Sequence, residues 1–222
     1  LDLDILKQCI SQRVDGIITL LEPEDDVIDT AKLNNIPLVM LGRNVDKDYI
    51  DLVYTDDKLG GQLAAYYLIN FHHLDKFVYI KLANAECSRR RFDAFQKAVK
   101  ELNSDAEIAV INQNQLNTKL IQLIHNQYYG LFCFNDELAY EALKILNKEI
   151  PNVRKVLPRL HIVGYDCIST RINGFTDLTS IDFDYDEICH TAVKFLLNRF
   201  ENIKLEQQKI VFTVKLHQRK YI

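Results

Sequence analysis

The chain of 222 residues is poor in the residues that mark linkers and irregular loops, with only seven glycines and four prolines. No Pro-, Gly- or Ser-rich stretch, internal repeat or low-complexity segment interrupts it. The sequence therefore predicts no flexible linker between separately folded parts. No apolar run approaches the roughly 20 residues that a membrane helix needs, and no signal peptide is visible, so we expect no membrane partner.

An excess of positive charge is also lacking. The chain has 27 Lys and Arg against 31 Asp and Glu, a net charge of −4 and a sequence pI near 5.9. A basic surface is what holds the phosphate backbone of nucleic acids, and Arg89-Arg90-Arg91 is too short to provide one. The chain by itself is therefore not expected to bind DNA.

Cysteine pairs and catalytic motifs are missing as well. The five cysteines are an odd number without a C-x-x-C pair, which favours buried free thiols in a reducing, cytoplasmic compartment over disulfides or a metal site. The sequence contains no G-x-S-x-G, G-x-x-x-x-G-K-[ST], H-E-x-x-H or G-x-G-x-x-G motif, and its six histidines are scattered. We therefore expect no catalytic residue, no metal and no cofactor, and conclude that the chain is not an enzyme.

Short apolar runs alternate with helical periodicities along almost the whole chain. Leu6 and Ile10 indicate an amphipathic helix at the start, and Ser88 is a candidate helix cap. Strands are predicted at 16–21, 37–41, 52–54, 77–80, 108–111, 131–134, 162–163, 179–181 and 210–216. Repeated strand–helix units predict an α/β fold of parallel sheets covered on both faces.

Polar clusters follow several of these strands. They are Tyr54 to Asp57, Ser88 to Arg91, Asn135-Asp136 and Gly164-Tyr165-Asp166. Capping of helices would explain Asp56-Asp57 and Asn135-Asp136, and Asp166 could simply close a turn. Ligands of open parallel sheets lie beyond the carboxyl ends of the strands, however, and Arg, Asp and Asn together suit a polyol.

The order of the motifs resembles the lactose/galactose repressor family over essentially the whole chain. The matching elements, in sequence, are Val14-Asp15-Gly16-Ile17-Ile18, Ile36-Pro37-Leu38-Val39, Asp56-Asp57 with Gly60, Ser88 with Arg91 and Phe95, Phe134-Asn135-Asp136 with Ala139, Val163-Gly164-Tyr165-Asp166, Leu178-Thr179-Ser180-Ile181, and Val214-Lys215-Leu216 with Arg219.

This resemblance implies the type I periplasmic-binding-protein fold, in which two doubly wound lobes are joined by three crossovers. The expected N-terminal lobe takes residues 1–72 plus 182–204, and the C-terminal lobe takes 73–181 plus 205–222. Family members carry a helix-turn-helix headpiece and a first strand–helix–strand ahead of the point where this sequence begins. The chain is thus expected to be a truncated regulator whose operator DNA is read by the missing headpiece.

The resemblance also implies the effector site. Arg91 matches the effector-binding arginine, Asp166 the effector-binding aspartate, and Asn135 a cleft-lining asparagine. Arg89 matches a basic position that some members use, Phe183 falls where a cleft residue often lies, and Asp56 belongs to the facing group of the other lobe. Among the departures, Cys167 and Phe183 can reshape the pocket, and His72 replaces a glycine where an unchanged backbone would need φ > 0.

These observations together predict a small-molecule sensor. Effector, a sugar or sugar derivative, closes the cleft and thereby repositions the headpieces of a homodimer. The alternative is an extracytoplasmic sugar receptor of a transport system, which shares the fold. The odd cysteine count and the repressor-like pattern from Val214 to Arg219 argue against it.

Overall fold

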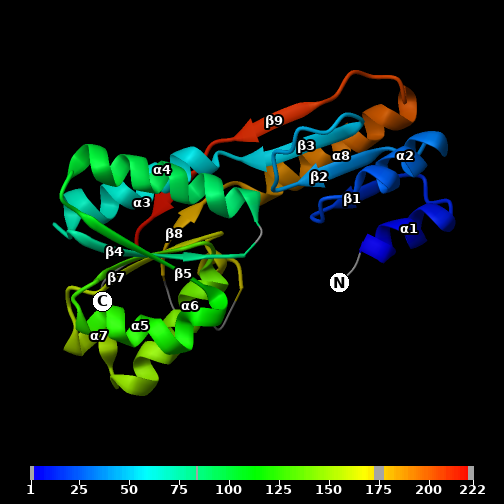
Figure 1. The fold of residues 1–222 in the computed structure, drawn as a ribbon. Coiled ribbons are helices and arrows are strands. Elements are labelled where there is room, and N and C mark those ends of the chain that lie inside the picture. Colours follow the sequence, from blue (N-terminus) through cyan, green and yellow to red (C-terminus); the bar gives the residue numbers. More distant parts are fainter. Residues whose placement is uncertain (1–2, 84, 173–177, 220–222) are drawn as a thin grey trace. The chain divides into compact units, whose positions relative to one another are not determined.

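The computed structural model describes residues 3–83, 85–172 and 178–219. Its chain divides into two structural units and passes three times from one to the other (Figure 1). Unit 1 contains the chain up to residue 56 and residues 184–213, and unit 2 contains residues 57–183 and the chain from 214 onward. The predicted α/β architecture, with two sheets and three crossovers, is confirmed. The description below treats each unit by itself.

The limits of the units differ from the expected lobe boundaries of 1–72 plus 182–204 and 73–181 plus 205–222. Residues 57–72 lie in unit 2, because helix α3 (Asp57–Tyr66) packs there against α4 (Glu86–Leu102). Residues 205–213 lie in unit 1, because strand β9 (Lys209–Phe212) pairs in parallel with β3 (Ile50–Thr55). Contacts between distant segments therefore move both boundaries.

Unit 1 is a four-stranded parallel sheet in the order β1-β2-β3-β9. Leu38, Met40 and Leu52 pack with one set of helices, and Val39 and Val53 are buried on the opposite face, where α8 lies against β2 and β3. The remaining elements of the unit are α1 (Leu3–Ser11), β1 (Ile17–Thr19), α2 (Asp25–Leu33), β2 (Leu38–Leu41) and α8 (Tyr185–Glu201).

A buried ion pair ties α8 to the sheet of unit 1. The guanidinium of Arg199 donates to both carboxylate oxygens of Asp51, at 2.8 and 2.7 Å, and both side chains are less than 5% exposed. Asp51 also accepts from the backbone and side chain of Gln208, just before β9. One carboxylate thus holds the helix and the last strand of this unit together.

Unit 2 is a six-stranded sheet in the order β10-β8-β7-β6-β4-β5, parallel except for β10. Figure 1 shows α3 and α4 on one side of the sheet and α5 and α6 on the other. The remaining elements are the π-helical turn η1 (Tyr67–Phe71), β4 (Lys76–Lys81), β5 (Glu107–Asn112), the 3₁₀ turn η2 (Gln113–Gln115), α5 (Leu116–His125), β6 (Gly130–Cys133), α6 (Asp136–Glu149), α7 (Val153–Val156), β7 (His161–Tyr165), the 3₁₀ turn η3 (Ile168–Thr170), β8 (Thr179–Asp182) and β10 (Lys215–His217).

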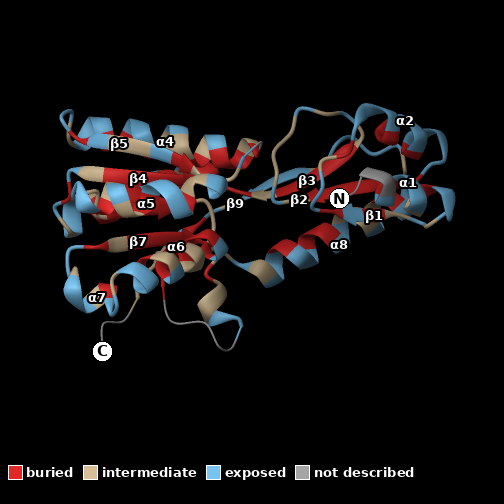
Figure 2. Cartoon of the chain, turned by 60° about the horizontal axis from the view of Figure 1, so that its bottom comes forward, coloured by how far each residue is buried: buried red, intermediate tan, exposed pale blue. Residues whose placement is uncertain are grey.

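The central strand β4 shows why its apolar run forms a strand buried on both faces. Phe77, Val78, Tyr79 and Ile80 are all 0% exposed. Val78 and Ile80 pack into the cluster of α5 and α6, whereas Phe77 and Tyr79 pack with α3 and α4, as a two-residue period requires. In Figure 2 the central strands are buried along most of their length, while β9 is mostly exposed.

The predicted last strand, 210–216, is wrong as a single element. Residues 209–212 form β9, which pairs with β3 in unit 1, and residues 215–217 form β10, which pairs antiparallel with β8 in unit 2. Thr213 and Val214 lie at the third crossover. A continuous apolar pattern does not reveal that its two halves have different partners.

Two predictions at helix ends also need correction. Ser88 does not cap α4, which begins at Glu86; instead its buried hydroxyl lies 3.1 Å from the Tyr79 hydroxyl. His72 has φ −113°, and the left-handed residue is His73 at φ 52°. The π-helical turn η1 accounts for this, because its wider winding adds a residue before the helix ends.

The cysteine prediction is confirmed for three positions. Cys87, Cys133 and Cys167 are buried, and all five thiols are free. Burial raises the pKa of the Cys133 thiol, so this group stays protonated. Among the described residues, no helix is both long enough and apolar enough to cross a membrane.

Candidate effector-binding site

Arg91 is the centre of the polar group at the carboxyl edge of the unit 2 sheet. Its side chain is buried, its Nε donates to Asp57 at 2.8 Å, and its Nη1 donates to the Phe134 carbonyl at 2.7 Å. The guanidinium lies 3.4 Å from the ring centroid of Tyr165 and 4.8 Å from that of Phe134. Two aromatic faces and two hydrogen bonds therefore fix its orientation.

Glycines allow helix α3 to bring Asp57 within reach of Arg91. A Cβ at Gly61 would lie 2.3 Å from the Arg91 carbonyl oxygen, and a Cβ at Gly60 would lie 2.6 Å from the Tyr165 ring. Only glycine permits such close approach of α3 to α4 and to β7. The pair of glycines thus positions both partners of the ion pair.

Asp166 follows β7 in an unusual turn. Its φ is 95°, and the next residue, Cys167, has φ 51°, both in the left-handed region that favours glycine. Nη1 of Arg171 donates to the carbonyls of Asp166 and Cys167, at 3.0 and 2.8 Å. The hydroxyl of Ser180 accepts the Cys167 N–H at 3.0 Å. Side chains from two segments therefore hold the turn in a conformation that costs energy.

The turn is held from a third side by Asp136, the first residue of α6. Its carboxylate accepts from the Ile168 N–H at 2.8 Å and from the Ser180 hydroxyl at 2.6 Å, and its side chain is fully buried. Burial raises the pKa of Asp136 to about 7, although both hydrogen bonds act in the opposite direction. A Cβ at Gly164 would lie 1.9 Å from its Oδ1, so glycine is required opposite this carboxylate.

The Asp166 carboxylate differs from the other carboxylates of this group in its hydrogen bonds. It makes no hydrogen bond with any other described residue, although its backbone N–H donates to the Ile181 carbonyl at 2.9 Å. Burial raises its pKa, and the positive charge of Arg91 opposes that rise. Burial alone would lower the pKa of Arg91, but the fields of Tyr165, Asp57 and Asp166 raise it above its ordinary value. Arg91 and Asp166 thus share one electrostatic environment.

Asn135 and Phe183 lie at neighbouring strand ends. The Asn135 side chain accepts from the Leu138 N–H at 3.0 Å and caps α6, so the capping interpretation holds for this residue. Phe183 follows β8, is half-buried, and its ring centroid is 6.1 Å from that of Tyr165. Both residues border the group around Arg91 through elements that the sheet places next to β7.

Arg89 and Asp56 do not join this group within unit 2. Arg89 precedes Arg91 by two helical residues, about 200° around the helix axis, and it is exposed and paired with Glu86 and Asp93. It lines a surface cavity of about 430 Å³ instead. Asp56 belongs to unit 1, where its N–H donates to the Phe212 carbonyl at 2.9 Å.

Three residues of this group, Asp57, Asp136 and Ser180, were not among the effector-binding residues predicted from the sequence. Asp57 and Asp136 are interpretable there as helix caps, and Ser180 is a small polar residue in a predicted strand. The consecutive glycines Gly60 and Gly61 in a helical pattern are the one signal of a close approach that the sequence contains.

Comparison with known proteins agrees with this architecture. A family model described as periplasmic binding protein-like domain matches residues 66–220. The transcriptional repressor PurR of Actinobacillus pleuropneumoniae serotype 5b is 26% identical over 91% of this chain and 62% of its own length. The ribose operon repressor of Escherichia coli K12 is 25% identical over 96% of this chain and 67% of its own length.

Among solved structures, a LacI family transcriptional regulator from Enterococcus faecium with bound ribose superimposes with a TM-score of 0.81 at 24% identity. The match covers 98% of this chain and 82% of that protein. The chain therefore spans about 62% of the PurR relative and most of the ligand-binding structure. These relatives are regulators, in agreement with the expectation that the chain is not an enzyme.

The family model covers well over half of the chain, and the solved structure has the same fold. The chain belongs to the periplasmic binding protein-like domain family.

Proposed function

We propose that this chain is the sensing region of a transcriptional repressor and that it binds a small sugar beside Arg91 and Asp166 in unit 2. The observation that supports this most directly is the Asp166 carboxylate, which lies in a strained turn and makes no hydrogen bond to another described residue. Folding does not favour such an arrangement by itself, so a ligand that donates to the carboxylate explains it.

The chemistry of the two residues suits adjacent hydroxyl groups. The printed contacts of Arg91 use one donor on Nε and one on Nη1, which leaves the Nη2 donors for a ligand. Asp166 can accept hydrogen bonds from two hydroxyls, and the rings of Tyr165 and Phe183 border the site with apolar surface. Ribose is the first probe to use, since one relative is a ribose operon repressor and a solved neighbour holds ribose.

Asp166→Asn tests the site with little structural disturbance. Asparagine has the same shape and tolerates φ > 0 better than most residues, so the turn is retained. Loss of hydrogen bonds to a charged group costs about 1.5–3 kcal/mol, which corresponds to about a 10- to 100-fold weaker affinity. Isothermal titration with ribose, other pentoses, hexoses and nucleobases measures this effect. Arg89→Ala is the matched control and should change affinity less than twofold.

The role of Arg91 requires a paired substitution. Arg91→Met alone removes the positive charge 2.8 Å from the buried carboxylate of Asp57 and should destabilise the fold. Arg91→Met with Asp57→Asn removes both charges, so stability should recover while ligand affinity does not. If the double variant binds as tightly as the parent, or if Asp166→Asn has no effect on any ligand that binds, the site assignment is wrong.

The wider role belongs to the same proposal. The relatives' names support a repressor, and that of PurR a helix-turn-helix type. The proposal includes action in the cytoplasm on operator DNA, through a helix-turn-helix segment outside this sequence, and assembly as a homodimer. Closure of the two units upon ligand binding would transmit the signal. Codons upstream of Leu1 that encode a helix-turn-helix pattern would support the repressor, and a signal peptide there would favour the transport receptor.

A further inference from the structure

The Arg171 side chain joins the turn that carries Asp166 to the end of strand β8. Its Nη1 donates to the carbonyls of Asp166 and Cys167, at 3.0 and 2.8 Å. Its Nη2 donates to the Asp182 carboxylate and, at 2.8 Å, to the Phe183 carbonyl. These four acceptors belong to two segments of unit 2 that lie far apart in the sequence. One guanidinium therefore connects both segments.

The turn after β7 depends on such support. Asp166 and Cys167 have φ angles of 95° and 51°, and non-glycine residues keep such angles only where their surroundings hold them. The two carbonyls that Arg171 binds belong to the peptide groups on either side of Cys167. The orientation of these peptide groups and the direction of the Asp166 side chain are set by the same stretch of backbone. Arg171 thus positions the Asp166 carboxylate through the main chain.

The other end of the link lies beside two crossovers of the chain. Phe183 is the last residue of unit 2 before the chain enters unit 1, and Lys215 comes just after the chain has returned. The Asp182 carboxylate accepts the Phe183 N–H at 2.9 Å and lies 3.6 Å from the Lys215 ammonium group. Asp182 therefore contacts residues next to the second and third crossovers, and Arg171 connects this carboxylate to the Asp166 turn.

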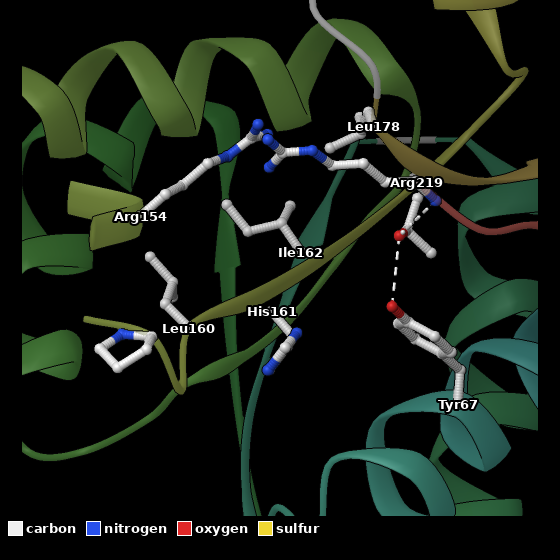
Figure 3. A pocket seen from close by; sticks show the side chains of 9 residues that line it. Tyr67, Arg154, Leu160, His161, Ile162, Leu178 and Arg219 are labelled. Carbon is white, nitrogen blue, oxygen red and sulfur yellow. Dashed lines mark hydrogen bonds between the residues drawn. The ribbon is translucent and has the colours of Figure 1, made fainter. Parts of the chain in front are cut away.

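The start of β8 is fixed by hydroxyl groups (Figure 3). The Thr179 hydroxyl lies 3.3 Å from the Tyr67 hydroxyl and accepts the backbone N–H of Arg219 at 3.2 Å, as the dashed lines in Figure 3 show. Ile181, further along the strand, is 0% exposed and pairs with β7. A shift of the turn is therefore passed on at the carboxyl end of β8, where Arg171 binds, and not by movement of the whole strand.

From these contacts we propose that Arg171 is a positioning residue of the sugar site and that it couples the Asp166 turn to the second crossover. The coupling rests on the proposed function, because it needs a ligand that donates to Asp166. Such a ligand acts on the turn, and the guanidinium passes the change on to Asp182 and Phe183. Arg171 thereby affects the affinity for the sugar as well as the response of the residues that lead into unit 1.

The first experiment measures sugar affinity by isothermal titration, with the member of the sugar panel that binds the parent. Arg171→Gln removes the charged fork, and Arg171→Lys keeps the charge but lacks the planar fork that reaches both segments. Each variant should weaken binding about 10-fold, which corresponds to about 1.4 kcal/mol. Arg159→Gln, an exposed residue outside these contacts that changes the net charge equally, is the matched control and should change the affinity less than about twofold.

A double-mutant cycle separates positioning of Asp166 from a general loss of stability. In the Asp166→Asn background, Arg171→Gln should weaken binding by less than about twofold, because its effect in the parent acts through the carboxylate that is now missing. A residue that only stabilised the fold would weaken binding by the same factor in both backgrounds. Equal factors in the two backgrounds would therefore overturn the proposal.

Amide chemical shifts test the coupling to the crossovers. Saturating sugar should shift the amide signals of Cys167, Asp182 and Lys215 in the parent. In Arg171→Gln at saturation, Cys167 should still respond, whereas Asp182 and Lys215 should not, because the link between the two segments is broken. Responses of Asp182 and Lys215 that are the same in the parent and in Arg171→Gln would contradict the coupling.

Hydrogen exchange of the chain without ligand gives a test that does not depend on which sugar binds. The N–H groups of Cys167 and Phe183 each donate to a side chain, at the two ends of the Arg171 link. Both should exchange at least about 5-fold faster in Arg171→Gln than in the parent, while Leu131 in the core stays unchanged. Unchanged exchange at both positions would overturn the proposal even if no sugar of the panel binds.

Failure of the proposed function has a different signature. A parent chain that binds no sugar, or an Asp166→Asn variant that binds as tightly as the parent, contradicts the sugar site itself. A sugar that binds the parent and Arg171→Gln equally well, but Asp166→Asn more weakly, leaves the sugar site in place and overturns only the role of Arg171.

Discussion

Asp136→Asn should remove a pH dependence of stability that a single buried carboxylate creates. The Asp136 side chain is fully buried, and its pKa is raised from 3.8 to about 7. Between these values the folded chain keeps the proton and the unfolded chain releases it. The contribution of Asp136 to the free energy of unfolding is therefore fully present below about pH 4, and it is lost as the pH rises through about 7.

The size of the effect follows from the two pKa values. At about 1.4 kcal/mol per pH unit, the full difference corresponds to about 4 kcal/mol, of which about 2.5 kcal/mol is lost between pH 5 and pH 8. Asparagine keeps an acceptor for the Ile168 N–H, and the Ser180 hydroxyl can reverse to accept from the new amide. The variant should therefore fold without this titrating group.

Urea unfolding followed by circular dichroism at pH 5 and pH 8 measures the difference. Between pH 5 and pH 8 the free energy of unfolding of the parent should fall by about 2.5 kcal/mol more than that of Asp136→Asn. Asp105→Asn, which removes an exposed carboxylate, serves as the control and should follow the parent. Equal pH slopes for the parent and Asp136→Asn would refute the assignment of a raised pKa to this buried group.

Two further predictions concern single residues of each unit. Gly164→Ala places a Cβ 1.9 Å from Asp136 Oδ1 and should lower the free energy of unfolding by about 3 kcal/mol. The control Gly42→Ala, at φ +75° with free space around it, should lower it by about 1 kcal/mol. Similar decreases for both variants in urea unfolding would contradict the argument from steric overlap. Arg199→Met leaves Asp51 buried without its partner and should destabilise unit 1 by about 3–5 kcal/mol; thermal unfolding checks this, and adding Asp51→Asn should recover much of the loss.

The sequence predicts a strand or helix well where the whole element packs within one structural unit. The run Phe77 to Ile80 is apolar at every position, and a buried parallel strand is what such a run favours. The run 210–216 has the same appearance, but its two halves pair with strands in different units. Periodicity reports burial and contains no information about which strand is the partner.

The places of Arg91 and Asp166 near the carboxyl edge of the unit 2 sheet were predictable from the sequence, whereas the contacts that hold them were not. Arg91 and Asp166 follow predicted strands, so the carboxyl edge of a parallel sheet is their expected place. The ion pair of Arg91 with Asp57 depends on the close approach that Gly61 allows. The exposure of Arg89 likewise depends on which face of α4 is turned toward the sheet. Three consecutive arginines do not show which of them lies on that face.

The most direct test of the proposed function is a calorimetric comparison of the parent chain and Asp166→Asn against the sugar panel. We predict that the parent binds at least one pentose or hexose and that Asp166→Asn binds it about 10- to 100-fold more weakly, with Arg89→Ala unchanged. A sugar that binds the parent and Asp166→Asn with equal affinity would contradict the assignment of the ligand to the carboxyl edge of the unit 2 sheet.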